Sequence, residues 1–473
     1  MRMSLNRLFV AAIVVGVVIA RASAGEQADY AIVVSSQTAG DAAWSKVVDV
    51  LKAKHSARVV TFDKHVDEAL AALKESMPRH IAFVATPTEA TREFVADVHR
   101  LTRRLDDDPY TDALWGIVTG YDAENALNIV QTSSPLLVKK VAAGTDIELA
   151  ACTEGVWYCE LVKNRMMRKL PNGAAREERG PDDTTQALAA TLADYRADLF
   201  VTSGHATQRD WQIGFAFRNG SFRSQGGKLF GHPTAGDAKG TKLGNAEPFE
   251  IVSDNPKVYL AVGNCLMGHI DSQDAMALAW LNSAGVRQMA GYTVLTWYGY
   301  AGWGMLDYFV EQPGRFNMAE AFFANQQALL HRLETEFPEV AREIPEPGKT
   351  RGRGDAAGLL HDRDVLAFYG DPAWDARLAP GPLRWEQSLV EKDGKWTLTI
   401  TPKAGADTFK PVNKNGSQRG GRPIIAMLPR RIGKVKIEGG AELKPVVTDD
   451  FVLVPLPTGD VKEKYEVVFR EVE

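Results

Sequence analysis

Short apolar runs that alternate with amphipathic helical patterns organise the first hundred or so residues of the chain. The apolar runs occupy 29–36, 57–63 and 80–86, and helical patterns occupy 40–56, 66–77 and 89–105. Strands that alternate with helices of this length are typical of βαβ units and a parallel sheet. Runs without polar residues, such as Ile32–Val34 and Ile81–Val84, suit strands that are covered on both faces. The pattern therefore predicts an α/β fold.

A second α/β region follows. Apolar strands are expected at 198–204, 258–264 and 286–293, with helices at 184–197, 274–285 and 318–337. Between the first two strands, Asn219-Gly220 lies within alternating residues and predicts a hairpin turn. The glycine-rich stretch 225–247 that follows is expected to form a surface loop.

From residue 381 onward the helical pattern disappears. Short alternating runs separated by turn residues predict a small β-sandwich. With 473 residues the chain is too long for one ordinary core. We expect an N-terminal α/β subdomain at 25–105, a second α/β subdomain at 106–380 and a C-terminal β-sandwich at 381–473.

The first 24 residues have the layout of a secretory signal. A short basic segment precedes the apolar run 8–20, and Ala22-Ser23-Ala24 offers a cleavage site. The run is shorter than the ~20 apolar residues that a membrane-spanning helix needs. Cleavage after Ala24 would release an exported protein, periplasmic, cell-surface or extracellular, without an integral membrane segment. A net charge of −5 gives no sign of nucleic-acid binding.

Three cysteines make an odd number for an exported chain. Cys152 and Cys159 are close enough in sequence to form a bridge if the residues between them turn. Cys265 then remains, and its presence needs an explanation. It is either a buried core residue or a reactive thiol.

His205 and Cys265 each follow an apolar strand. Functional side chains in parallel α/β sheets collect beyond the C-terminal ends of strands, so these two side chains converge if their strands are neighbours. A thiolate beside an imidazole is suited to attack on an amide carbonyl. Gly204 and Gly263 let the backbone approach a ligand closely. The amides of Ala206 and Cys265 are candidates to hold the oxyanion.

This arrangement resembles the active site of caspase-like cysteine peptidases, and within them the chain most resembles the gingipain family. The stretches 106–127 and 289–302, and the segment around Gly370-Asp371-Pro372, are similar to family landmarks in the same order. The likeness covers roughly residues 28–380. It implies a caspase-like parallel-sheet α/β sandwich in two subdomains, with 106–380 catalytic, followed by an immunoglobulin-like β-sandwich. It also implies a cysteine endopeptidase of protein or peptide substrates that needs no metal or organic cofactor.

Further site residues are expected from the same comparison. A histidine in this chemistry is often oriented by a third group, for which Asp112, Asp122 and Glu154 are candidates. Glu154 is favoured because the family's acidic partner precedes the histidine by a similar stretch. The aromatic cluster at 292–303 borders the cleft in the family, so Trp297, Tyr298 and Trp303 are candidate substrate contacts, with buried packing as the other interpretation.

Two features keep other functions open. Ala206 stands where the family has glycine, and Asn264 stands where a small residue is usual. Both favour the alternative that the chain is a catalytically inactive peptidase-fold protein that binds or sorts a partner. A zinc site formed by Cys265, His269 and Asp271, with His205 or His232, is a third possibility, although no pair of ligands has a familiar zinc spacing.

Overall fold

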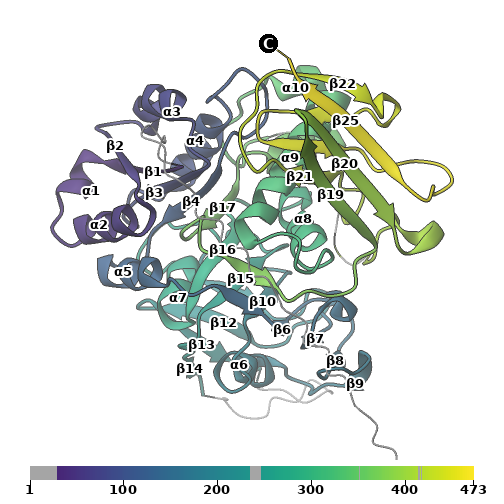
Figure 1. The fold of residues 1–473 in the computed structure, drawn as a ribbon. Coiled ribbons are helices and arrows are strands. Elements are labelled where there is room, and N and C mark those ends of the chain that lie inside the picture. The colour runs from purple at the N-terminus through teal and green to yellow at the C-terminus, as the bar shows by residue number, and fades with distance from the viewer. Residues whose placement is uncertain (1–28, 235–246, 351, 414–415, 417, 473) are drawn as a thin grey trace, which may run out of the picture.

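The computed structural model describes residues 29–234, 247–350, 352–413, 416 and 418–472 (Figure 1). The signal sequence expected at 1–24 lies outside these residues. Within them, no helix combines the length and the apolar character that crossing a membrane requires.

A twelve-stranded sheet runs through the centre of the molecule. In spatial order its strands are β2 (Arg58–Phe62), β1 (Tyr30–Ser35), β3 (His80–Val84), β4 (Leu114–Val118), β17 (Leu366–Tyr369), β16 (Val286–Tyr292), β15 (Lys257–Ala261), β10 (Leu199–Thr202), β6 (Lys140–Ala143), β7 (Glu154–Tyr158), β8 (Arg165–Lys169) and β9 (Arg176–Arg179). The first five strands are parallel to one another, and so are the five from β16 to β7. The two blocks meet in antiparallel pairing between β16 and β17. Antiparallel β8 and β9 complete one edge.

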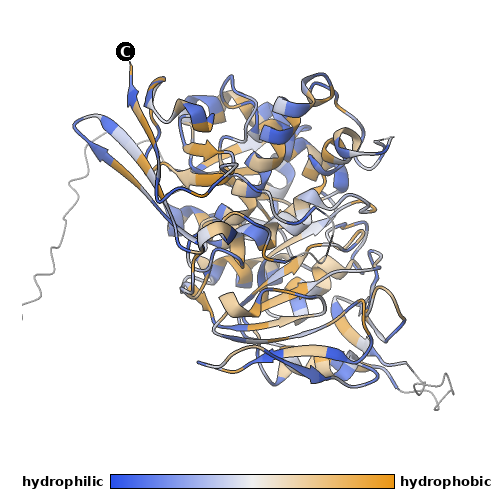
Figure 2. Ribbon diagram, turned by 90° about the vertical axis from the view of Figure 1, so that its right-hand side faces the viewer, coloured by the Kyte–Doolittle hydropathy of each residue, from blue (hydrophilic) through white to orange (hydrophobic). Residues whose placement is uncertain are grey.

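Helices cover both faces of this sheet (Figure 1). They are α1 (Ser36–Gly40), α2 (Trp44–His55), α3 (Leu70–Ser76), α4 (Arg92–Thr102), α5 (Ala123–Gln131), α6 (Thr185–Ala193), α7 (Met276–Ser283), α8 (Tyr300–Phe309), α9 (Met318–Glu336), α10 (Pro338–Ala341) and α11 (Asp355–Asp362). Alternate residues of β1 serve the two faces, as the period of a strand requires. Ile32 and Val34 join a core with α2 and α5, whereas Ala31 and Val33 join the large core on the other face. Figure 2 shows apolar colouring on strands that lie between the helices, and every residue of β1 is buried.

A separate four-stranded antiparallel sheet is inserted between β10 and β15. It consists of β11 (Asp210–Gln212), β12 (Ser221–Gln225), β13 (Lys228–His232) and β14 (Phe249–Ile251). The tight turn lies at Gly226-Gly227, where both residues have positive φ, and not at Asn219-Gly220 as the sequence predicted. Asn219 is buried because its side chain exchanges hydrogen bonds with Thr184. Part of the expected surface loop is therefore a hairpin.

Residues from 385 onward form two packed antiparallel sheets, which confirms the predicted C-terminal β-sandwich. One contains β19 (Trp385–Lys392), β20 (Lys395–Pro402), β25 (Tyr465–Glu471) and β22 (Val435–Gly439), and the other contains β21 (Ile424–Met427), β24 (Phe451–Val454) and β23 (Val446–Val447). The inward side chains of both sheets share one core. Short β5 (Leu136–Val138) and β18 (Ala376–Leu378) pair with each other beside the main sheet. The α/β fold with a large, mostly parallel sheet is likewise confirmed.

The segment after β17 ties the N-terminal strands to the rest of the sheet. Gly370 has a φ of 122°, and a Cβ there would lie 2.3 Å from the carbonyl oxygen of Arg287, so only glycine fits. The next residue, Asp371, is buried and accepts hydrogen bonds from Tyr30, Lys54 and His55. One carboxylate therefore holds β1 and α2 against the end of β17.

Candidate active site at the ends of two neighbouring strands

The strands that carry His205 and Cys265 lie side by side. β10 and β15 are parallel neighbours, and Thr202 faces Ala261 in their register. The ladder ends with a bond from the amide of Val262 to the carbonyl of Thr202 at 3.0 Å. His205 and Cys265 follow directly, at the same edge of the sheet. The adjacency on which the sequence argument depended is therefore present.

The loop of Cys265 has a strained backbone. The next residue, Leu266, has a φ of 59°, a left-handed conformation that costs a residue with a side chain roughly 1–2 kcal/mol. A bond from the Leu266 amide to the carbonyl of Val294 at 3.0 Å holds it. The amide of Thr296 points at Sγ of Cys265, 3.2 Å away, and Cys265 itself is half-buried. Such strain is often stored at functional sites, and the backbone amide and carbonyl of Thr296 both contact the sulfur and hold it in place.

The loop of His205 is fixed on both sides of the histidine. Gly204 has a φ of 91°, and the carbonyl of His205 accepts a hydrogen bond from the amide of Gln212 at 2.9 Å. The exposed imidazole stacks on the ring of Phe215, with centroids 4.8 Å apart. The fully buried indole of Trp211 donates to the carbonyl of Ser203 at 2.8 Å. The side chain of His205 is therefore exposed to solvent, on a loop that hydrogen bonds and ring packing hold in place.

A buried carboxylate that the sequence analysis missed lies behind this loop. Glu160, two positions beyond the end of β7, accepts hydrogen bonds from Ser203 at 3.1 Å and Thr145 at 2.8 Å. A Cβ on Gly204 would lie 3.4 Å from its Oε2 atom, so the carboxylate lies against the residue before His205. Its backbone carbonyl also accepts from the amide of Phe215, whose ring stacks on His205. The signal was present, because Glu160 follows an apolar run in the same way as His205 and Cys265 do.

The structure does not bring the favoured carboxylate, Glu154, to this edge. Glu154 begins β7 and pairs with Lys140 at the start of β6, which is the opposite edge of this parallel block. Its carboxylate accepts a hydrogen bond from the hydroxyl of Tyr195 at 3.2 Å. Asp112 is buried in the loop before β4, and Asp122 caps the N-terminus of α5. Each of these three carboxylates lies at or just before the start of a strand or helix and bonds there to groups other than His205.

The amides expected to hold the oxyanion are located on the two site loops. Ala206 forms a bridge with Trp211, which closes the loop after His205. Among the described residues, neither the amide of Ala206 nor that of Cys265 donates to a protein acceptor. Within the described part of the chain, neither N–H group is therefore committed to another protein atom. The methyl group of Ala206 replaces a hydrogen and leaves the amide in place.

Of the three aromatic residues proposed as substrate contacts, one is accessible. Trp297 is 44% exposed, beside Thr296, whose amide faces Cys265. Tyr298 is buried and donates to Asp355 at 2.9 Å. Trp303 is also buried, because its ring packs against Gly263 and Gly416. The packing interpretation therefore holds for Tyr298 and Trp303.

The three cysteines are free thiols in different surroundings. Cys152 is buried, and this burial raises the pKa of its thiol to about 12. Burial also raises the pKa of Cys159, beside Asp146. Cys265 is the most accessible of the three. The thiol at the candidate site is therefore also the one that solvent reaches.

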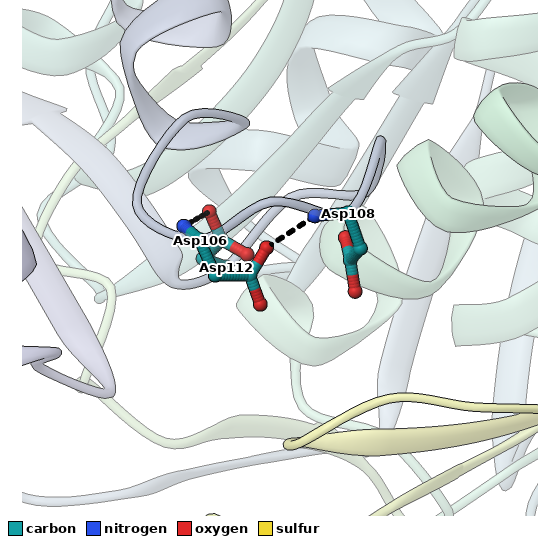
Figure 3. Close-up of side chains that lie close together, drawn as sticks. All are labelled: Asp106, Asp108 and Asp112. Carbon is teal, nitrogen blue, oxygen red and sulfur yellow. Dashed lines mark hydrogen bonds between the residues drawn. The ribbon is translucent and has the colours of Figure 1, made fainter. Parts of the chain in front are cut away.

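One group of side chains in the described part of the chain has the composition and closeness of a metal site. Asp106, Asp108 and Asp112 lie in one loop, with carboxylate oxygens within 4.8 Å of one another (Figure 3). Backbone amides of the loop bond to its own carboxylates, as the dashed lines show. Cys265, His269 and Asp271 do not form such a group in the described residues. Asp271 instead pairs with Arg209 at 2.6 Å.

Comparisons with known proteins give one similarity. No family model matches the chain, and no curated protein matches it. Among solved structures, the chain is similar to the complex of the pro- and mature domains of RgpB from Porphyromonas gingivalis. The two share 9% identity over 94% of this chain and 93% of that chain, with a TM-score of 0.41. RgpB is a gingipain, the family that the sequence resembles, and at this identity and score the likeness assigns neither residues nor activity.

Proposed function

We propose that the chain is an exported cysteine endopeptidase that hydrolyses peptide bonds with Cys265 and His205. The observation that carries the proposal is the location of these two residues at the C-terminal ends of adjacent parallel strands. Both are accessible, and each adjoins a residue in left-handed conformation, Leu266 or Gly204. A thiol and an imidazole on facing loops are suited to acyl transfer.

In the proposed reaction, the Cys265 thiolate attacks the carbonyl carbon of the scissile bond and forms a tetrahedral intermediate. The amides of Ala206 and Cys265 donate to its oxyanion. His205 gives a proton to the amine as the carbon–nitrogen bond breaks, which leaves a thioester on Cys265. His205 then takes a proton from water, whose oxygen attacks the thioester; the carbon–sulfur bond breaks, the acid leaves, and the Cys265 thiolate and the protonated His205 are restored. The balance requires water alone as co-reactant.

We assign the role of orienting His205 to Glu160 in place of Glu154. Glu160 bonds to Ser203 and lies against Gly204, both in the loop of His205. Its carbonyl holds Phe215, which stacks on the imidazole. A buried carboxylate behind the histidine would also stabilise the imidazolium that forms during the reaction.

Exposed apolar side chains adjoin both members of the proposed dyad: Phe215 stacks on His205, and Leu295 and Trp297 flank Thr296, whose amide contacts Cys265. Phe215 and Trp297 are 50% and 44% exposed, and Leu295, next to Thr296, is 64% exposed. Groups of exposed apolar side chains often mark a surface that binds a protein or a ligand. We propose that they contact apolar parts of a protein or peptide substrate.

The experiment compares the chain that begins at Gly25 with Cys265→Ser and His205→Ala, using an unfolded protein such as casein as substrate. Each substitution is expected to reduce proteolysis by roughly 10³-fold or more, because the two groups act as a unit. Cys159→Ser is the control and should retain activity. Iodoacetamide at neutral pH should modify Cys265 before Cys152 and Cys159. Proteolysis that survives both substitutions would refute the proposal, and casein that is bound but never cleaved would favour the inactive binding protein.

A further inference from the structure

The side chain of Asn264 continues the link between β10 and β15 where their backbone ladder ends. The last ladder bond joins the amide of Val262 to the carbonyl of Thr202. Beyond it, in the described part of the chain, the next hydrogen bonds between the two loops belong to Asn264. Oδ1 of Asn264 accepts from the hydroxyl of Thr202 at 2.5 Å, and Nδ2 donates to the carbonyl of Gly204 at 3.1 Å. Gly204 is the residue before His205, and Asn264 is the residue before Cys265.

The direction of each hydrogen bond in this group is determined. The carbonyl of Gly204 only accepts, so the amide nitrogen of Asn264 faces it and the amide oxygen faces Thr202. The Thr202 hydroxyl uses its one proton toward Asn264, so the hydroxyl of Tyr259, 2.8 Å away, donates to Thr202. The result is a buried chain of donors from Tyr259 through Thr202 to Asn264. Bonds in such a chain polarise and strengthen one another.

Asparagine is suited to this position for a physical reason. Asn264 is fully buried, and a buried amide is costly unless both its donor and its acceptor are paired. Both are paired here, with Thr202 at the end of β10 and with Gly204 in the loop of His205. A small residue at this position, as the gingipain resemblance leads one to expect, would supply neither bond. The departure from the family pattern is therefore compensated within the fold.

We propose that Asn264 is a positioning residue that holds the loop of His205 in register with Cys265. The inference rests on the proposed peptidase function. The two loops need a link of this kind because each departs from strand geometry directly after its strand, with left-handed backbone at Gly204 and at Leu266. Asn264 acts through the carbonyl of Gly204 and touches neither the thiol nor a substrate. Losing it would leave the strands intact and let the imidazole drift relative to the sulfur.

The test measures two quantities in the intact chain: the rate of Cys265 alkylation by iodoacetamide as a function of pH, and kcat and KM on a peptide substrate. Asn264→Ala should lower kcat about 10- to 100-fold with little change in KM, because a displacement of the order of 1 Å has that cost. The pH midpoint of the alkylation rate should also shift. Thr202→Val, which keeps the shape and removes the bond to Oδ1, should have a smaller effect in the same direction.

The matched control is Asn125→Ala. Asn125 is another buried asparagine that joins two segments, since it accepts from the amide of Tyr121 and donates to the carbonyl of Leu281. Its loss should lower stability comparably without changing kcat or the pH midpoint. If Asn264→Ala does not fold, Thr202→Val decides the question by the same two measurements.

The outcomes separate the two proposals. If His205→Ala shifts the alkylation profile but neither Asn264→Ala nor Thr202→Val does, the positioning role is refuted and the dyad stands. If His205→Ala leaves the profile unchanged, the dyad itself fails. If Asn125→Ala changes kcat and the midpoint as much as Asn264→Ala does, the effect is one of general stability and the inference is overturned.

Discussion

The ring of Phe215 stacks on the imidazole of His205, with centroids 4.8 Å apart and planes inclined by 25°. The amide of Phe215 is held by the carbonyl of Glu160 at 2.8 Å. We expect Phe215→Ala to lower kcat about tenfold, because the imidazole loses the surface that limits its rotation. Phe215→Tyr should retain most activity, since it keeps the ring.

The control for this prediction is Phe217→Ala in the same loop, whose ring packs against Gly214. It should leave kcat within about twofold, because that ring lies against the loop's own backbone. Steady-state kinetics on one peptide substrate checks all three variants. Equal losses at 215 and 217 would show that the loop as a whole is important and the stacking is not.

Glu154 and Glu160 lie at opposite ends of β7, one at its first residue and the other two positions beyond its last, and they offer a direct comparison of two carboxylates. Glu160→Gln should reduce kcat/KM about 10- to 100-fold, the usual effect of losing a group that orients a functional side chain. Glu154→Gln should change it less than about twofold, since its partner is Tyr195 at the other edge. Both substitutions conserve shape and remove one charge. A larger loss for Glu154→Gln would restore the assignment made from sequence.

The positions of His205 and Cys265 were predictable because local patterns determine them. Each follows a run of apolar residues long enough for one strand, and glycine or asparagine ends the run. Their placement at one edge of the sheet depends on the pairing of β10 with β15, which lie more than fifty residues apart in the chain. That pairing is a long-range property. The inserted sheet separates the two strands in sequence, so no local pattern predicts that they are neighbours.

Other predictions failed where tertiary contacts outweigh local preference. Asn219-Gly220 has the composition of a hairpin turn, but Thr184 holds Asn219 in a buried site and the turn forms at Gly226-Gly227. The aromatic residues near 300 could not be divided by pattern, because the burial of Trp303 depends on the distant glycines Gly263 and Gly416, against which its ring packs. Glu160 follows a short apolar run, but its link to His205 depends on contacts with Ser203 and Gly204 in the loop of another strand, which no local pattern indicates.

Asp371 should make the fold sensitive to acid. Burial alone would raise its pKa, but the hydrogen bonds and charges of His55 and Lys54 outweigh it and hold the pKa well below its ordinary value. The carboxylate therefore contributes stability that is full above about pH 4, the unfolded value, and is lost as the pH falls further. Asp371→Asn should lower the free energy of unfolding by roughly 3 kcal/mol at pH 7.

At pH 2 the difference between Asp371→Asn and the native chain should be smaller, because the native chain has then lost part of the same contribution. Urea unfolding at both pH values measures it. Asp460→Asn, at an exposed position, is the control and should change little at either pH. A loss that does not vary with pH would show that Asp371 acts through packing alone.

Asp112 should have the opposite effect, at higher pH. Its burial and the nearby charges of Asp106 and Asp108 raise its pKa to about 9 (Figure 3). The folded chain therefore holds a proton that the unfolded chain releases near pH 4. The stability that Asp112 contributes is full below about pH 4, the pKa of the unfolded chain, and is lost as the pH rises through about 9, the pKa of the folded chain. Measured in the presence of a chelator, the free energy of unfolding should fall between pH 5 and 9.

Asp112→Asn should flatten this fall, because the amide oxygen can still accept from the amides of Leu105 and Asp106 without carrying a charge. We expect the variant to be more stable than the native chain by about 1–3 kcal/mol at pH 8 and similar to it at pH 4. Asp107→Asn, exposed in the same loop, should leave the slope unchanged. A native chain whose stability is flat over this range, or an Asp112→Asn variant that is weaker by a constant amount, would show that the other groups around Asp112 already balance its charge.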